Sequence, residues 1–258
     1  MAEAFDGSAL RLRWSEAPWD EAVLGYTVFL LEQIDLCGEA ALAAKEFEAF
    51  ERARALRGVG LVSCRLPHQS LRESMLLEDR GFRFIEMVYR PSRMLRADEH
   101  WDHGLQIERA GARDLPLLQS IAATAFRNER FCMDPRLDSS ASDRRYANWV
   151  ASAFDHPQQQ LYVLRDGSLV VAFFVLEWQA DGACYWHLNA IAPQAQGQGY
   201  GRRAWSAMMG LAAENGCVRV HSSVVARNHR VINLYARLGF SFSEPTMTFH
   251  WVRGGRAP

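Results

Sequence analysis

Apolar and polar positions along the chain follow two spacings, which predict an alternation of strands and amphipathic helices. Apolar residues at helical spacing, with a capping residue before them or a glycine after them, predict helices over the ranges 39–57, 70–80, 114–125, 140–153 and 228–238. Short runs rich in β-branched and aromatic residues predict strands over 10–14, 26–34, 60–66, 82–89, 105–108, 160–165, 169–179, 183–192, 218–225, 240–243 and 246–253.

Two dipeptides of the kind that close tight hairpins lie between three consecutive predicted strands. They are Asp166-Gly167 and Asp181-Gly182. The strands over 160–192 are therefore expected to form an antiparallel meander.

An internal similarity divides the chain into two parts. The sequence R-G-F-R-F at 80–84 and the sequence L-G-F-S-F at 238–242 each follow a strand and a helix. The N-terminal part therefore resembles a partial copy of the back half of the C-terminal part. We expect two α/β units, with an N-terminal domain over 1–97, a charged linker over 98–104 and a larger domain over 105–258.

Composition narrows the class of protein. The net charge of −1 argues against a surface built for nucleic acid or anionic lipid. The five cysteines are far apart and include no C-x-x-C pair, so neither a disulfide framework nor a metal site is expected. The N-terminus lacks the features of a signal peptide, and the longest apolar run, 169–176, is too short to span a membrane. We expect a cytoplasmic location.

A glycine-rich loop follows the last strand of the meander. It reads I-A-P-Q-A-Q-G-Q-G-Y-G-R-R over 191–203, and a helix follows it that ends at Asn215-Gly216. Alternating glycines at a helix start leave backbone N–H groups uncovered, and these suit a phosphate or pyrophosphate. The loop matches neither a Walker A sequence nor the dinucleotide fingerprint, and on its own it is also compatible with a flexible turn.

The order of elements together with two motifs resembles the GCN5-related N-acetyltransferase (GNAT) superfamily. The first motif lies in the glycine loop, and the second is N-H-R-V-I-N-L-Y-A-R-L-G-F over 228–240. The resemblance implies a GNAT fold, in which helices flank a mixed, mostly antiparallel sheet, preceded here by a smaller partial GNAT-like domain. It implies acetyl-CoA as co-substrate, held by Asn189, Ile191, Gln196, Gly197, Gln198, Gly199, Tyr200, Gly201 and Asn228.

The resemblance also suggests the groups that move protons. It makes Tyr235 the general acid that protonates the leaving thiolate, whereas the apolar stripe around Tyr235 would by itself indicate a core residue. It makes Glu86 the base, and the strand period places Glu86 on the side of Phe82 and Phe84. A solvent-exposed Glu86 is an equally simple interpretation. The alternative bases are His68, His187 and His221.

A narrower resemblance extends over the N-terminal half. W-D-E-A-V-L-G at 19–25, E-D-R-G-F before Glu86, and R-F-C-M-D-P with Y-A-N-W over 130–149 are similar to the dTDP-fucosamine (TDP-4-amino-4,6-dideoxygalactose) acetyltransferases of bacterial surface-polysaccharide synthesis. This implies a nucleotide-linked aminosugar as acceptor, with Trp19, Arg130 and Asp134 near it. A homodimer is compatible with the sequence.

The sequence is also compatible with two other functions. The same fold could acetylate another small amine, such as an amino acid or an aminoglycoside. The chain could also be a coenzyme A sensor without catalysis. Turnover on a panel of amines, and its sensitivity to Tyr235, would distinguish them.

Overall fold

The computed structural model describes residues 2–96 and 99–255, and the chain divides into two compact units that are not continuous in sequence. The first unit contains the described residues up to Val88, residues 130–141 and residues 244–255. The second contains 89–96, 99–129 and 142–243. This division differs from the expected continuous boundaries, and the expected boundary at 97–98 lies outside the described residues.

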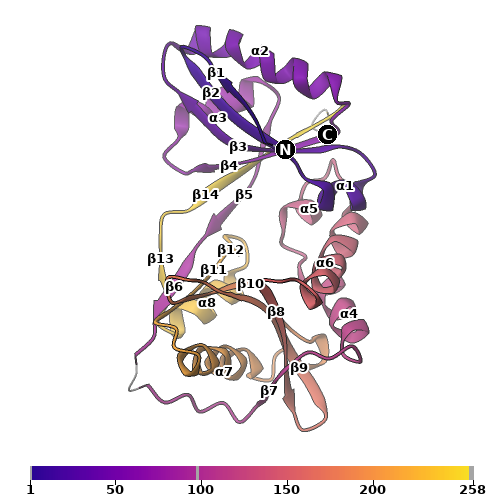
Figure 1. The fold of residues 1–258 in the computed structure, drawn as a ribbon, viewed down its shortest axis with the longest axis vertical. Helices are drawn as coiled ribbons and strands as arrows, with labels where there is room; N and C mark the ends of the chain where they lie inside the picture. The colour runs from indigo at the N-terminus through magenta and orange to yellow at the C-terminus, as the bar shows by residue number, and fades with distance from the viewer. Residues whose placement is uncertain (1, 97–98, 256–258) are drawn as a thin grey trace. The chain divides into compact units, whose positions relative to one another are not determined.

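The first unit is built on a sheet with the strand order β1-β2-β3-β4-β14-β5 (Figure 1). Only β3 and β4 run parallel within it, and the other neighbours are antiparallel. The strands are β1 (Glu3–Asp6), β2 (Leu10–Glu16), β3 (Val28–Leu36), β4 (Leu61–Pro67), β5 (Arg83–Tyr89) and β14 (Thr246–Val252). The helices are α1 (Pro18–Leu24), α2 (Ala40–Leu56), α3 (Leu71–Asp79) and α5 (Arg130–Met133).

Helices α2 and α3 bury apolar residues against one face of this sheet. Phe47 and Phe50 of α2 are fully buried and lie on the same face of the helix, because they are three residues apart. They pack in one core with Leu77 of α3 and Phe249 of β14. The opposite face carries a smaller cluster around Phe131 of α5.

The second unit has its own sheet, with the order β13-β6-β11-β10-β9-β8-β7. Its strands are β6 (Pro91–Met94), β7 (Gln106–Arg109), β8 (Gln159–Asp166), β9 (Leu169–Trp178), β10 (Ala183–Ile191), β11 (Arg219–Ser222) and β13 (Ser241–Phe242), and β12 (Val224–Val225) follows β11. Its helices are α4 (Leu115–Ala125), most of α6 (Ser139–Phe154), η1 (Pro193–Ala195), α7 (Tyr200–Glu214) and α8 (His229–Arg237).

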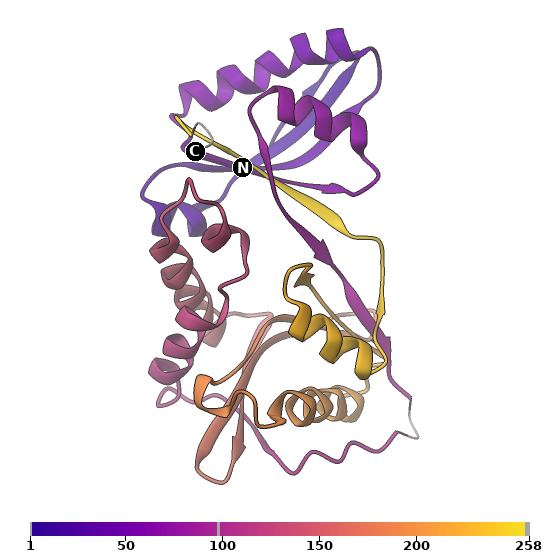
Figure 2. The same cartoon turned by 180° about the vertical axis from the view of Figure 1, so that it is seen from behind.

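Helices α7 and α8 lie beside each other on one face of the second sheet (Figure 2). Trp205 of α7 contacts Phe174 of β9 at a ring distance of 4.9 Å and Tyr235 of α8 at 6.2 Å. Helix α6 covers the opposite face, where Trp149 meets His187 of β10. The mixed, mostly antiparallel sheet flanked by helices confirms the predicted fold class.

Local sequence patterns located most elements but not all of them. No strand was predicted over 91–94, but this segment forms β6, which pairs with β11 and β13. The final strand, β14, lies between β4 and β5 in the first unit. No helix within 2–96 and 99–255 is long and apolar enough to cross a membrane.

Candidate active site

The centre of the second sheet opens where two parallel strands separate. Strand β10 pairs with β11 from Ala183 opposite Arg219 to Trp186 opposite Ser222. Beyond that point β10 continues to Ile191, and no described residue of β11 pairs with it. The exposed edge of 187–191 can therefore pair with an extended ligand, because its hydrogen-bonding groups on that side are not used by a strand.

The glycine loop lies at the end of this edge and begins α7. Gly197 and Gly199 have φ angles of 79° and 83°, and Gly199 is the N-cap of α7. A Cβ atom would meet nothing within 4 Å at either position, so backbone conformation rather than crowding favours glycine there. The first N–H groups of α7 therefore point outward without side chains over them, which suits a pyrophosphate.

The side chains of the loop hold its shape. Gln196 and Gln198 donate hydrogen bonds to the carbonyl groups of Ile191 and Gln194, at 3.3 and 2.7 Å. The hydroxyl group of Tyr200 donates to Asp166 at the end of β8, at 3.0 Å. These contacts fix both ends of the loop.

A pocket of about 510 Å³ joins the open strand edge, the loop and the start of α8. Most of the predicted coenzyme A residues line it: Asn189, Ile191, Gln196, Gly197, Gly199, Tyr200, Gly201 and Asn228. Gln198 does not line it and only supports the loop. The side chain of Asn228 accepts a hydrogen bond from the Val231 N–H at 3.3 Å, so Asn228 is also the N-cap of α8.

Three arginines that line this pocket were not predicted. Arg202 of α7 and Arg230 and Arg237 of α8 are exposed, and none forms an ion pair with a described residue. Arg230 and Arg237 are seven residues apart, so they lie on the same face of α8. This spacing can be read from the sequence, but exposed charged residues on a helix more often contact only solvent than bind a ligand. Here they give the pocket a positive potential that suits a phosphorylated ligand.

Tyr235 lies behind the wall of this pocket and is only 1% exposed. Its hydroxyl group has no hydrogen-bond partner at normal distance and angle among the described residues. Burial raises the pKa of Tyr235, and the nearby side chains of Ser222, Trp205 and Asn189 oppose that rise. Asn189 and Trp205 line the pocket, so Tyr235 lies next to two of its lining side chains.

Glu86 belongs to the first unit, and its predicted orientation is wrong. The register of β5 against β14 shifts between Phe84 and Glu86, so the two side chains do not share a face. Phe84 is 47% exposed and Glu86 is 1% exposed. Glu86 forms an ion pair with Arg65, whose Nη2 lies 3.8 Å from Oε1.

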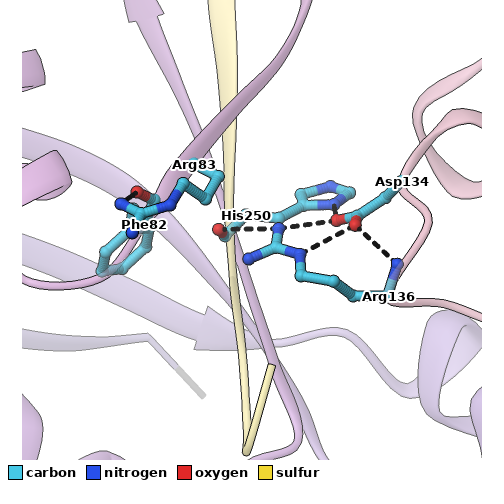
Figure 3. A network of polar contacts seen from close by, with 5 residues as sticks. All are labelled: Phe82, Arg83, Asp134, Arg136 and His250. Atoms are coloured by element: carbon cyan, nitrogen blue, oxygen red, sulfur yellow. Dashed lines mark hydrogen bonds and ion pairs between the residues drawn. The ribbon is translucent and has the colours of Figure 1, made fainter. Parts of the chain in front are cut away.

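Asp134 lies at the centre of a buried polar network in the first unit (Figure 3). Arg136 donates three hydrogen bonds to its carboxylate, from the backbone N–H at 3.1 Å, Nε at 2.8 Å and Nη2 at 2.7 Å. His250 Nδ1 lies 2.9 Å from Oδ2. These contacts use the acceptor sites of the carboxylate, so the structure accounts for Asp134 without a substrate.

The other two predicted substrate residues are also in the first unit. Trp19 of α1 is 57% exposed. Arg130 of α5 forms an ion pair with the buried Asp20 at 3.9 Å, and its guanidinium lies over the Phe131 ring. Because Asp20 follows Trp19 directly, this ion pair brings Trp19 and Arg130 to the same part of the unit.

Solved structures with this fold include several acetyltransferases. A GCN5-related N-acetyltransferase from Sphaerobacter thermophilus is 14% identical, with a TM-score of 0.63 over 96% of this chain and 82% of that one. One from Kribbella flavida is 14% identical, with a TM-score of 0.59 over 99% and 91%. A fungal region described as a GCN5-related glucosamine N-acetyltransferase, in a multi-domain β-N-acetylglucosaminidase, is 13% identical, with a TM-score of 0.64 over 94% of this chain and 31% of that one. At these identities the likeness shows the fold alone.

Comparison with family models adds the function, while no curated protein sequence matches the chain. The model of the acetyltransferase (GNAT) family matches residues 123–240. That range begins in α4 and contains the meander, the open strand edge, the glycine loop and α8. Residues 123–240 are therefore similar to the GNAT family of acetyltransferases, and this similarity indicates an acyl-CoA-dependent N-acyltransferase.

Proposed function

We propose that this acyltransferase moves the acetyl group of acetyl-CoA directly to the amino group of a nucleotide-linked amino-deoxysugar. The observation that carries the donor part is the pocket formed together by the open edge of β10, the glycine loop and the start of α8. The loop offers uncovered N–H groups to the pyrophosphate, and Arg202, Arg230 and Arg237 supply positive charge around it.

Tyr235 is the proposed general acid. Loss of the thiolate needs a proton, and a buried phenol stays protonated at neutral pH because burial raises its pKa. A phenol is a weaker acid than a thiol, so the transfer depends on close positioning of the hydroxyl and the sulfur. The neighbouring Asn189 and Trp205, which line the pocket, support that position.

The acceptor is the finer part of the proposal and rests on the first unit. Trp19 is exposed enough to stack on a nucleobase, and Arg130 provides a guanidinium on the same part of that unit. The fungal glucosamine N-acetyltransferase region shows that the fold has been described with an aminosugar acceptor in another protein. The subfamily of dTDP-fucosamine acetyltransferases stays a prediction from the sequence.

Location and assembly complete the proposal. All five cysteines are free thiols, which suits the reducing cytoplasm. The homodimer stays a prediction that light scattering of the purified chain tests directly.

A thiol-release assay tests the function. Purified chain and acetyl-CoA are combined with dTDP- and UDP-aminosugars, free amino acids and aminoglycosides. We expect turnover on a nucleotide aminosugar, and a loss of about 100-fold in kcat for Tyr235→Phe, within the usual range for general acid catalysis. Tyr162→Phe is the matched control, because Tyr162 is also a buried tyrosine of the second unit but does not line the pocket.

Each other outcome has a clear meaning. Turnover only on amino acids or aminoglycosides would replace the proposed acceptor while keeping the enzyme. Tight coenzyme A binding without turnover on any amine would favour the sensor. Full activity of Tyr235→Phe would remove Tyr235 from the mechanism.

A further inference from the structure

His187 occupies the point at which the two parallel strands separate. The last β10–β11 pair joins Trp186 and Ser222, and His187 is the next residue. The register of β10 against β9 shifts between Trp186 and Leu188, so His187 is the additional residue of a β-bulge. Bulges beside active sites often redirect a side chain, and this one lies at the start of the open edge.

The bulge places His187 and Asn189 on opposite faces of the sheet. Asn189 pairs with Phe174, whose ring contacts Trp205 of α7, so Asn189 faces α7 and Tyr235. His187 instead contacts Tyr185 and Trp149 of α6, at ring distances of 4.6 and 6.2 Å. In a regular strand, residues two apart would share a face. The open edge is therefore flanked by Tyr235 on one face and by His187 on the other.

Glu177 fixes the hydrogen-bonding state of His187. Glu177 Oε2 lies 2.9 Å from His187 Nε2, and the two side chains are 27% and 15% exposed. A carboxylate accepts hydrogen bonds, so in the neutral ring Nε2 carries the hydrogen and Nδ1 carries the lone pair. A histidine oriented by a carboxylate in this way is the arrangement of a general base.

We propose that His187 Nδ1 accepts the proton that the acceptor amine loses, with Glu177 as a positioning residue. This inference rests on the proposed acyl transfer. The amine nitrogen forms a bond to the acyl carbon and passes one proton to Nδ1. The bond between the acyl carbon and sulfur breaks, and sulfur takes a proton from the Tyr235 hydroxyl. The imidazolium then releases its proton to water, and the phenolate takes one back.

The surroundings of His187 keep its imidazole ring neutral, and therefore able to accept a proton, near neutral pH. Burial is the main cause that lowers the pKa of His187, and the carboxylate of Glu177 opposes it. The titratable groups nearby are Tyr185 on the same strand, His221 on β11 and His156 after α6; the charge of His156 lowers the pKa further. Arg145 of α6 lies over the Trp149 ring.

Glu86 is the competing base. It belongs to the first unit, is 1% exposed and faces the guanidinium of Arg65. His187 lies in the same unit as the coenzyme pocket and two residues from Asn189, which lines it.

The test compares His187→Gln with His221→Gln in the thiol-release assay. A glutamine at 187 keeps a donor for Glu177 but removes the basic nitrogen. His221 is the matched control, because it also contacts the Tyr185 ring and hydrogen-bonds a side chain, Gln179 at 2.8 Å, but lies in the paired part of the sheet. We expect kcat/KM to fall about 100-fold in His187→Gln and less than threefold in His221→Gln. Coenzyme A affinity should stay within threefold in both, which shows that the variants fold.

The pH dependence of kcat/KM in Glu177→Gln distinguishes a positioning role from a purely structural one, because a purely structural residue would not change the pKa seen in that profile. In the wild type, kcat/KM rises as the pH rises through the pKa of His187. We expect that limb to shift to lower pH in Glu177→Gln, because the carboxylate raises the pKa of His187. The same limb should be absent from the residual activity of His187→Gln.

The possible failures are distinguishable. If the wild type turns over an aminosugar and His187→Gln keeps its kcat/KM, this inference is overturned, and a loss in Glu86→Gln would transfer the role to Glu86. If the wild type binds coenzyme A and acylates no amine, the proposed function is wrong, and this inference, which depends on it, is wrong too.

Discussion

At the scale of single residues, the buried pair of His250 and Asp134 couples the stability of the first unit to pH. Both side chains are fully buried, and burial lowers the pKa of His250 to about 4. The unfolded chain, with a histidine pKa of about 6.5, therefore binds more protons than the folded chain between pH 6.5 and 4. The stabilisation is complete above pH 6.5 and is lost as the pH falls toward 4.

We therefore expect the free energy of unfolding to fall by about 3 kcal/mol from this residue between pH 7 and pH 4. Urea unfolding at a series of pH values measures it. His250→Asn keeps a donor near Asp134 but does not titrate, so it should flatten the dependence. His229→Asn, at an exposed position, should leave the slope unchanged. An equal slope in the wild type and His250→Asn would show that another group is responsible.

The pocket arginines make a second prediction at this scale. Arg230 and Arg237 line the pocket on one face of α8 and have no described ion-pair partner. Changing both to alanine should raise the coenzyme A Kd about tenfold and weaken its dependence on salt, because two exposed charge contacts are lost. Arg219, which forms an ion pair with Asp181 at 2.7 Å, is the control whose loss should leave the Kd unchanged in calorimetry.

At the scale of elements, the glycine loop was predictable and the bulges were not. Gly197 and Gly199 predict the loop, because each allows a left-handed backbone conformation that other residues rarely adopt. No local pattern marks the shift between Phe84 and Glu86, so strand alternation alone placed Glu86 on the wrong face. The bulge at His187 could not be predicted from the sequence either, so nothing distinguished His187 from the other two candidate histidines.

The loop's conformation can be tested separately from its function. Gly199→Ala should destabilise the chain by about 1 kcal/mol, since it places a side chain at a φ of 83°. It should also weaken coenzyme A binding at least tenfold, because the new methyl group covers the N–H groups of α7. Gly167→Ala is the matched control: its φ is 58° and it has equally open surroundings, but it lies in the β8–β9 turn. Equal loss of affinity in both variants would mean that the loop acts only through stability.

At the scale of the whole molecule, the chain exchanges strands between its two repeated units. In the first sheet, β14 lies between β4 and β5, and in the second sheet β6 lies between β11 and β13. Each inserted strand directly follows the last repeated strand of the other unit in sequence. The similarity of 80–84 to 238–242 predicted the repeat, but the exchange is a pairing between distant segments. A single sequence read locally does not contain it.

Because of this exchange, two residues close together in the sequence can stabilise different units. Phe249 of β14 is 2% exposed and belongs to the core of the first unit, whereas Phe240, nine residues earlier, is 5% exposed and belongs to the core of the second. Phe249→Ala should destabilise the first unit by about 3–5 kcal/mol, and Phe240→Ala should do the same to the second. Hydrogen exchange followed by mass spectrometry separates the two effects.

Phe249→Ala should speed exchange in β4 and β5, the two neighbours of β14, and leave β10 protected. Phe240→Ala should speed exchange in the second sheet and weaken coenzyme A binding, because its ring packs on Tyr235 at 4.7 Å behind the pocket. If Phe249→Ala instead loosened β10 and the glycine loop, β14 would act as part of a continuous C-terminal domain over 105–258. The strand exchange would then not divide the stability of the chain, and the two units would have to unfold as one.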